Sequence, residues 1–162
     1  MRKWITGIVL GAALLCAAES RAQYNREYFF WMGRRCVMEN DYQAAIRTLN
    51  TLLRFDEDAH EGYFLRGVAK YNLDDLIGAE ADLSMAIAKN PVYTQAYYYR
   101  AVTRSRLGNY DDALQDFREA IDLRPDLPGP YYSRGMTRLL NGQYREAIED
   151  FDKFIRQDNK VA

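Results

Sequence analysis

The chain has few of the residues from which most catalytic and metal sites are built. It contains one histidine, His60, and two cysteines, Cys16 and Cys36. No pair of these residues has the spacing of a metal-binding motif, and no serine lies in the sequence context of a nucleophile elbow. Carboxylates are plentiful, but they recur with a fixed period, which is typical of solvated helix faces and ion pairs. The sequence therefore favours a protein that is not an enzyme and that holds no metal or other cofactor.

Positive charge is not in excess either. The chain carries 22 Lys and Arg residues against 23 Asp and Glu residues, which gives a formal net charge of −1 at pH 7. Affinity for nucleic acid comes largely from basic side chains that meet phosphates, so a nucleic acid is not expected as a partner. The apolar and charged fractions are those of an ordinary folded protein, which argues against disorder and allows one domain with a packed core.

The only long apolar run lies near the N-terminus, from Trp4 to Ala18. This run is shorter than the roughly 20 residues that a helix needs to cross a bilayer. Arg2 and Lys3 precede the run, and Ser20-Arg21-Ala22 follows it with small residues at the two positions that a signal peptidase reads. This order of features predicts a cleavable signal peptide and hence an exported protein.

The predicted signal peptide comprises residues 1–22, and residues 23–162 form the folded domain. Its removal would leave Cys36 as the sole cysteine, so no intramolecular disulfide could form. Export favours the periplasm or the outer membrane of a Gram-negative bacterium as the location. An uncleaved anchor and a lipid anchor at Cys16 are weaker alternatives, the second because Leu15 is larger than the residue that usually precedes a lipidated cysteine.

The rest of the sequence repeats with a period of 34 residues and without an insertion. The four units are 26–59, 60–93, 94–127 and 128–161. In each unit the fourth place is aromatic, the eighth is small, the twentieth is Ala and the twenty-fourth is large and apolar. In that order the residues are Phe29, Tyr63, Tyr97, Tyr131; Gly33, Gly67, Ala101, Gly135; Ala45, Ala79, Ala113, Ala147; and Leu49, Leu83, Phe117, Phe151. Small residues are needed where two helices approach closely, and the large residues would fill the gaps.

Each half of a unit has apolar residues at helical spacing, which predicts two amphipathic helices per unit. Turn residues separate the halves, and Pro91 and Pro125 would end the second helices of units two and three. The turn dipeptides are Asn40-Asp41, Asp74-Asp75, Gly108-Asn109 and Asn141-Gly142. The predicted fold class is therefore all-α, with eight antiparallel helices.

The segment YYYRAVTRSRLGNYDDALQDFREAIDLRP, which begins at Tyr97, resembles the tetratricopeptide repeat. The resemblance extends over residues 26–161. Unit one departs most from the pattern, with Glu57 where Pro is usual and Leu52 where units two and three have Ala. The resemblance implies an α-solenoid of four helix-turn-helix units that forms a right-handed superhelix. It also implies that the first helices of the units line a concave groove.

Two cations and an Asp recur together in units two to four, at the seventh, eleventh and twenty-third places. The set consists of Arg66, Lys70, Asp82, Arg100, Arg104, Asp116, Arg134, Arg138 and Asp150. Unit one has Met32, Cys36 and Thr48 at these places, so all three members are replaced at once. This joint replacement predicts that the two cations, one helical turn apart, face the Asp on the second helix, within the unit or across to the next. We interpret the set as structural.

The resemblance implies that the second, fifth, ninth and twelfth places of each unit face the groove. The fifth place is aromatic in all four units, and aromatic and apolar surface suits an extended peptide or a helix of a protein partner. The predicted groove residues are Phe30, Arg34, Phe64, Val68, Tyr71, Tyr98, Val102, Tyr132, Met136 and Leu139. The alternative for any one ring is that it packs between neighbouring helices. The Lys and Asn residues with which some tetratricopeptide domains clamp a carboxylate are absent.

The last helix would carry Phe151, Phe154 and Ile155 on a face that no capping helix covers. Such a face would meet a partner, mediate self-association, or pack on a further part of a longer protein. The sequence thus predicts a non-catalytic protein-interaction scaffold or adaptor of the bacterial cell envelope. The alternatives are a structural or assembly subunit that uses the C-terminal face and, on weaker grounds, a protein that binds glycans through its tyrosines.

Overall fold

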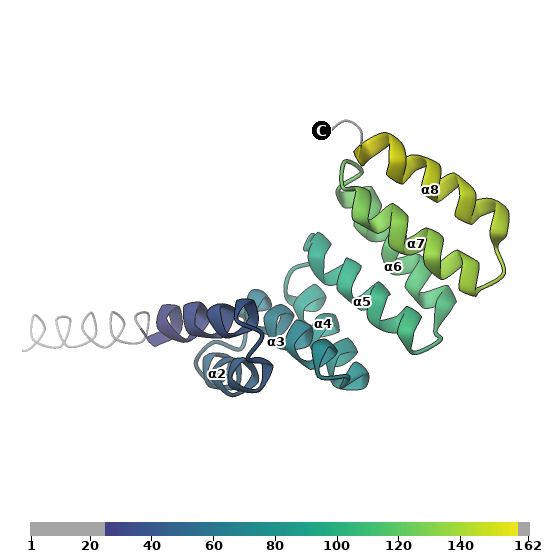
Figure 1. Ribbon diagram of the computed structural model, residues 1–162. Coiled ribbons are helices and arrows are strands. Elements are labelled where there is room, and N and C mark those ends of the chain that lie inside the picture. Colours follow the sequence, from purple (N-terminus) through teal and green to yellow (C-terminus); the bar gives the residue numbers. More distant parts are fainter. Residues whose placement is uncertain (1–24, 159–162) are drawn as a thin grey trace, which may run out of the picture.

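The computed structural model describes residues 25–158, and all regular secondary structure in this range is helical (Figure 1). The predicted signal peptide lies outside the described residues. Residues 25–38 form the N-terminal helical segment. It is followed by α2 (Tyr42–Phe55), α3 (His60–Asn72), α4 (Leu76–Lys89), α5 (Thr94–Arg106), α6 (Tyr110–Leu123), α7 (Pro128–Leu140) and α8 (Tyr144–Asp158). The helices pair into four hairpins, one in each predicted unit, so the all-α repeat architecture is confirmed.

The turn within each hairpin is set by one residue in the left-handed region of backbone conformation. The fifteenth place of every unit has a positive φ, at Asn40 (61°), Asp74 (66°), Gly108 (81°) and Gly142 (75°). Gly and Asn tolerate this conformation best, because other side chains crowd the following carbonyl. In the first two units the next residue is Asp, whose carboxylate caps the second helix by accepting a hydrogen bond from the backbone N–H three residues on, at 3.0–3.1 Å.

The two helices of a unit meet where the sequence places a small residue opposite a large one. A Cβ added to Gly67 would lie 2.9 Å from Leu83 Cγ, and one added to Gly135 would lie 2.8 Å from Phe151 Cε1. These separations are shorter than a carbon–carbon contact, so a larger residue fits only if the facing side chain or its helix shifts. In unit three, Ala101 shares a fully buried cluster with the ring of Phe117, which takes the place of Leu83.

Successive units pack so that the array curves. The first helices contact one another, α3 with α5 and α5 with α7, whereas α4, α6 and α8 make no such contact among themselves. The first helices therefore lie on the inner side of the curve (Figure 1). The second helices α4 and α6 instead pack between their own first helix and that of the next unit. The prolines 91 and 125 follow the ends of α4 and α6 by two residues, as predicted.

Candidate functional site

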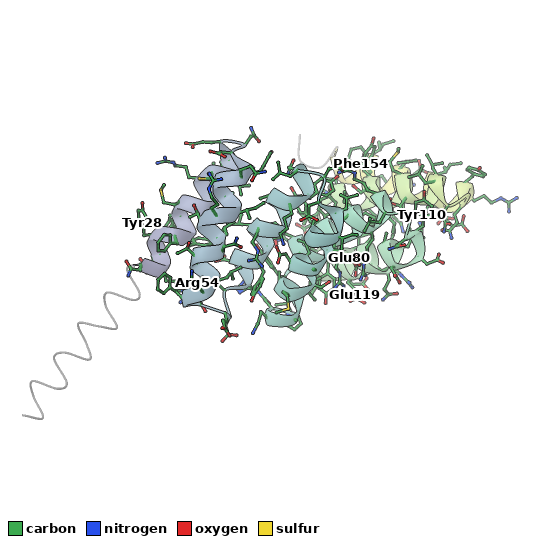
Figure 2. All side chains as sticks on the ribbon, turned by 90° about the horizontal axis from the view of Figure 1, so that it is seen from below. Tyr28, Arg54, Glu80, Tyr110, Glu119 and Phe154 are labelled. Carbon is green, nitrogen blue, oxygen red and sulfur yellow. The ribbon has the colours of Figure 1, made fainter. Side chains whose placement is uncertain are left out.

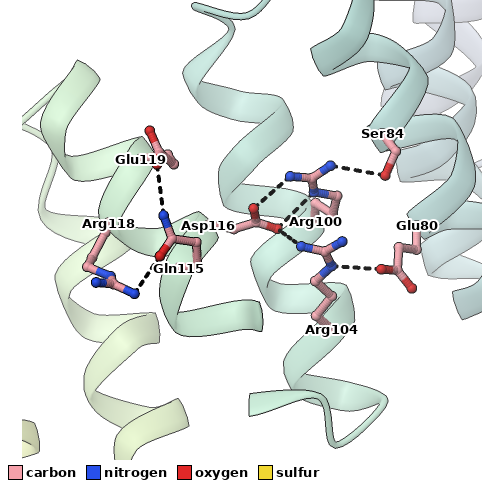
Figure 3. A network of polar contacts seen from close by, with 8 residues as sticks. All are labelled: Glu80, Ser84, Arg100, Arg104, Gln115, Asp116, Arg118 and Glu119. Carbon is pink, nitrogen blue, oxygen red and sulfur yellow. Dashed lines mark hydrogen bonds and ion pairs between the residues drawn. The ribbon is translucent and has the colours of Figure 1, made fainter. Parts of the chain in front are cut away.

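The cations that recur with Asp bind that Asp within their own units. Arg100 donates from Nε and Nη2 to the two carboxylate oxygens of Asp116, at 2.8 and 2.7 Å, and Arg104 Nη1 donates to Asp116 Oδ2 at 2.9 Å (Figure 3). The equivalent residues of units two and four make the same contacts at 2.6–2.9 Å. This is the arrangement that the joint replacement in unit one predicts. Because each Asp is buried and paired twice, these ion pairs stabilise the fold of each unit.

Each arginine of the seventh place also lies over the aromatic ring of the fourth place. The guanidinium carbon is 5.5 Å from the ring centroid of Tyr63 in unit two, 5.7 Å from that of Tyr97 in unit three and 5.8 Å from that of Tyr131 in unit four. An arginine over a ring gains a cation–π interaction in addition to its hydrogen bonds. The recurring sequence of an aromatic residue followed three places later by Arg therefore reflects packing inside the unit.

On the inner side of the array, fifth-place rings meet the sixth-place residue of the next unit. The centroids of Phe64 and Tyr99 are 5.5 Å apart, and the Tyr98 hydroxyl lies 3.1 Å from Ser133 Oγ. Phe64 also packs edge-on against Tyr93, at 5.1 Å. These rings are half-buried, so they join neighbouring units and still present part of their surface to the groove. The same fifth-place rings therefore both face the groove and pack between neighbouring helices.

Two clefts open between these rings. One has a volume of about 240 Å³ and lies between the N-terminal helical segment and α3; it is lined by Phe30, Arg34, Glu61, Phe64, Leu65 and Tyr93. The other has a volume of about 230 Å³ and lies between α5 and the start of α7. It is lined by Thr94, Gln95, Tyr98, Leu127, Pro128, Gly129 and Pro130. The second cleft is mostly apolar, so it suits an apolar side chain rather than a charged one.

Two tyrosines of this surface, Tyr93 and Tyr99, are not among the predicted groove residues. Burial raises the pKa of Tyr93 to about 12, and the nearby carboxylate of Glu61 adds to the shift. Burial likewise raises the pKa of Tyr99. Both hydroxyls therefore stay neutral over the whole physiological range and can donate a hydrogen bond. Tyr93 and Tyr99 occupy the last and sixth places of their units, where residue types vary, so the repeat pattern gave no signal for them.

The predicted groove residues differ in how much surface they offer. Val68 is buried (8% exposed) and packs in the core, because α3 is covered at that position; this residue is a correction to the predicted set. Tyr71 is half-buried beneath the Arg106 guanidinium, which lies 4.9 Å from the ring centroid. The exposed residues lie at the two ends of the array: Arg34 in the N-terminal helical segment, and Tyr132, Met136 and Leu139 on α7.

The C-terminal face is built differently from the prediction. Phe151 packs against Gly135 within its own unit, and Phe154, labelled on α8 in Figure 2, lies 5.3 Å from the Tyr132 ring. Of the three predicted residues only Ile155 is largely exposed, at 53%. Tyr144 and Ile148, which the prediction omits, are also exposed. Their spacing of four and seven residues places Tyr144, Ile148 and Ile155 on one face of α8, here called the α8 stripe.

Two segments of the chain, residues 94–127 and 129–161, match models of the tetratricopeptide repeat family. This chain contains tetratricopeptide repeats. Arrays of such repeats form extended concave surfaces that serve as protein-interaction scaffolds. No functionally curated protein matches the chain by sequence. Among residues 25–158, no group of three or more His, Cys, Asp and Glu side chains is placed to hold a metal ion, and no helix is long and apolar enough to cross a bilayer.

Solved structures of other repeat proteins have the same fold. A MamA crystal structure is 27% identical and superposes with a TM-score of 0.80, over 85% of this chain and 80% of MamA. The Arabidopsis OM64 TPR domain is 21% identical, with a TM-score of 0.70 over 72% of this chain and 97% of that domain. A Thermobaculum terrenum O-GlcNAc transferase is 18% identical, with a TM-score of 0.69, over 73% of this chain but only 23% of the transferase. The last two likenesses are of fold alone.

Proposed function

We propose that this protein is an exported, non-catalytic scaffold of the bacterial cell envelope that binds an extended peptide or a helix of a protein partner along the inner side of the array. The observation that carries the proposal is the pair of clefts between first helices, each bordered by fifth-place rings. The envelope location rests on the signal peptide predicted at residues 1–22.

The two clefts suit different parts of one partner. The cleft bordered by Phe64 also contains Arg34 and Glu61, so its rim can exchange hydrogen bonds and ion pairs with polar groups. The cleft bordered by Tyr98 ends on the Leu127–Pro130 segment and accepts an apolar side chain. Because rings that already pack on one another lose little side-chain freedom on binding, they supply contact area at a low entropic cost.

Gly129 provides a test that leaves the packing of the repeats intact. A Cβ at Gly129 would meet no atom within 4 Å, and Gly129 lines the Tyr98 cleft, so Gly129→Leu should add apolar bulk at this cleft. Peptides selected for binding from a random 12-residue library should bind this variant at least about tenfold more weakly. Asp122→Ala, an exposed change on α6, is the matched control and should leave affinity unchanged. Equal binding to both variants would place the binding site outside the Tyr98 cleft.

A second candidate function is assembly through the α8 stripe. Its support is that Ile155 is 53% exposed, whereas Ile121, at the same place in unit three, is 8% exposed because unit four covers it. Self-association should appear as a concentration-dependent mass in light scattering of residues 23–162. Ile155→Glu should restore the monomer, and Asp122→Glu is the matched control. A monomer at every concentration for the unsubstituted protein would exclude strong self-association.

A further inference from the structure

Arginines of unit three reach back to unit two as well as to their own Asp. Arg104 Nε donates to Glu80 Oε1 at 2.7 Å, and Arg100 Nη1 donates to Ser84 Oγ at 3.1 Å (Figure 3). Glu80 and Ser84 lie on α4, one helical turn apart. The junction of units two and three is therefore closed by a carboxylate and a hydroxyl that accept from the otherwise free N–H groups.

The junction of units three and four lacks both acceptors. Leu114 stands at the place of Glu80, and Arg118 stands at the place of Ser84. Arg134 and Arg138 keep their bonds to Asp150 within unit four. Arg138 Nε, however, is buried and has no hydrogen-bond partner among the described residues. A buried guanidinium N–H without an acceptor is costly, so the site is poised for an oxygen ligand.

A cleft of about 420 Å³ opens at this junction. It is lined by Asp111, Leu114, Arg118, Arg134, Arg138 and Gln143. Three guanidinium groups border it, whereas Asp111 is the one carboxylate among its lining residues, and Asp150 is already paired with Arg134 and Arg138. The site therefore keeps an excess positive charge. None of its lining residues belongs to the predicted groove, and the cleft lies between α6 of one unit and α7 of the next, with Gln143 of the turn before α8 at its edge.

We propose that this cleft binds a carboxylate, carried by a Glu or Asp side chain of a protein partner. The chain itself shows which group fits, because the Glu80 carboxylate occupies the equivalent position on Arg104. The planar edge of a guanidinium matches the two oxygens of a carboxylate, and the half-buried surroundings strengthen the pair by excluding water. The cleft thus adds a second, charge-selective contact to the apolar contacts of the groove.

The first experiment follows the arginine Nε–H signals of the ¹⁵N-labelled domain, residues 23–162, by NMR. Sodium acetate is the probe, and sodium chloride at equal ionic strength is its control. The Arg138 signal should shift saturably with acetate and not with chloride. The Arg104 signal should stay in place, since Glu80 already occupies its acceptor position. No shift at Arg138, or an equal shift with chloride, would overturn the proposal.

Two reciprocal variants test whether a carboxylate at the place of Glu80 decides if the arginine can bind acetate. Leu114→Glu supplies the carboxylate from within and should weaken acetate binding at Arg138 at least about tenfold. Glu80→Leu opens the equivalent position of unit three and should make the Arg104 signal sensitive to acetate. Acetate binding that neither variant alters would contradict the assignment, and circular dichroism would show that both variants keep their helices.

A peptide probe distinguishes a carboxylate of a protein partner from a small free carboxylate. An acetylated and amidated five-residue peptide, Ala-Glu-Ala-Glu-Ala, should shift the Arg138 signal at a concentration at least about tenfold lower than acetate does, because neighbouring peptide groups add contacts. Affinity no greater than that of acetate would overturn the assignment to a protein partner and leave a site for small free carboxylates.

Discussion

The second helices of units three and four, α6 and α8, have the same register but different surroundings. Ile121 on α6 is 8% exposed because α7 packs over it, whereas Ile155 at the same place on α8 is 53% exposed. Tyr110 is half-buried and its counterpart Tyr144 is exposed. The repeat motif therefore fixes how a helix packs inside its unit, while a neighbouring helix decides whether the outer face is buried or exposed.

The largest loss of stability is expected inside a unit, where units three and four have the same ion pairs. Asp116→Ala would leave the half-buried guanidiniums of Arg100 and Arg104 without their shared, buried carboxylate, which should cost about 3 kcal/mol of unfolding free energy. Asp150→Ala should be similarly harmful in unit four. Urea denaturation followed by circular dichroism measures both. A loss of less than about 1 kcal/mol at either position would show that the ionic set does not hold the unit together.

A smaller loss of stability should distinguish α6 from α8. Ile121→Ala removes buried apolar volume and should cost about 2–4 kcal/mol, whereas Ile155→Ala changes an exposed side chain and should cost less than about 0.5 kcal/mol. The comparison is matched, since both residues hold the same place in their units. Equal losses at low protein concentration would mean that the α8 stripe is covered in solution.

The smallest effect concerns Tyr93 and the loss of stability at alkaline pH. The pKa of Tyr93 is raised from 10.0 to about 12 in the folded protein, so the proton is held more tightly there than in the unfolded chain. The stability that this shift contributes is present below pH 10 and is lost as pH rises through about 12. After allowance for partial exposure, the loss should be about 1 kcal/mol. Tyr93→Phe should lack this alkaline step in thermal unfolding; an identical pH profile in both proteins would contradict the assignment.

The architecture and the ionic set could be predicted because their residues recur. The joint replacement of Arg, the second cation and Asp in unit one was enough to indicate that Arg100, Arg104 and Asp116 meet. Contacts between units were harder to predict, since they join different places. Tyr93 and Tyr99 fill gaps at places with no fixed residue type. The missing acceptor of Arg138 can be recognised only when this residue, at the eleventh place of unit four, is compared with Leu114, at the twenty-first place of unit three.

Exposure could not be predicted from the repeat either. Val68 occupies a place assigned to the groove, but its side chain is buried. Tyr144 and Ile148 occupy places that are half-buried in units one to three, so the pattern gave no sign that they would be exposed in unit four. Both outcomes depend on which neighbouring helix covers a position, and a single-unit pattern does not contain that information.

Site-specific photo-crosslinking in cells that produce the full chain tests the interaction scaffold most directly. The photoreactive residue p-benzoylphenylalanine would replace Gln95, which is exposed and borders the Tyr98 cleft, and in a separate strain Asp122 on α6. The scaffold account predicts a discrete protein adduct from position 95, its loss when Gly129→Leu is added, and none from position 122. Adducts of equal yield from both positions, or an adduct from position 95 that Gly129→Leu leaves unchanged, would contradict it.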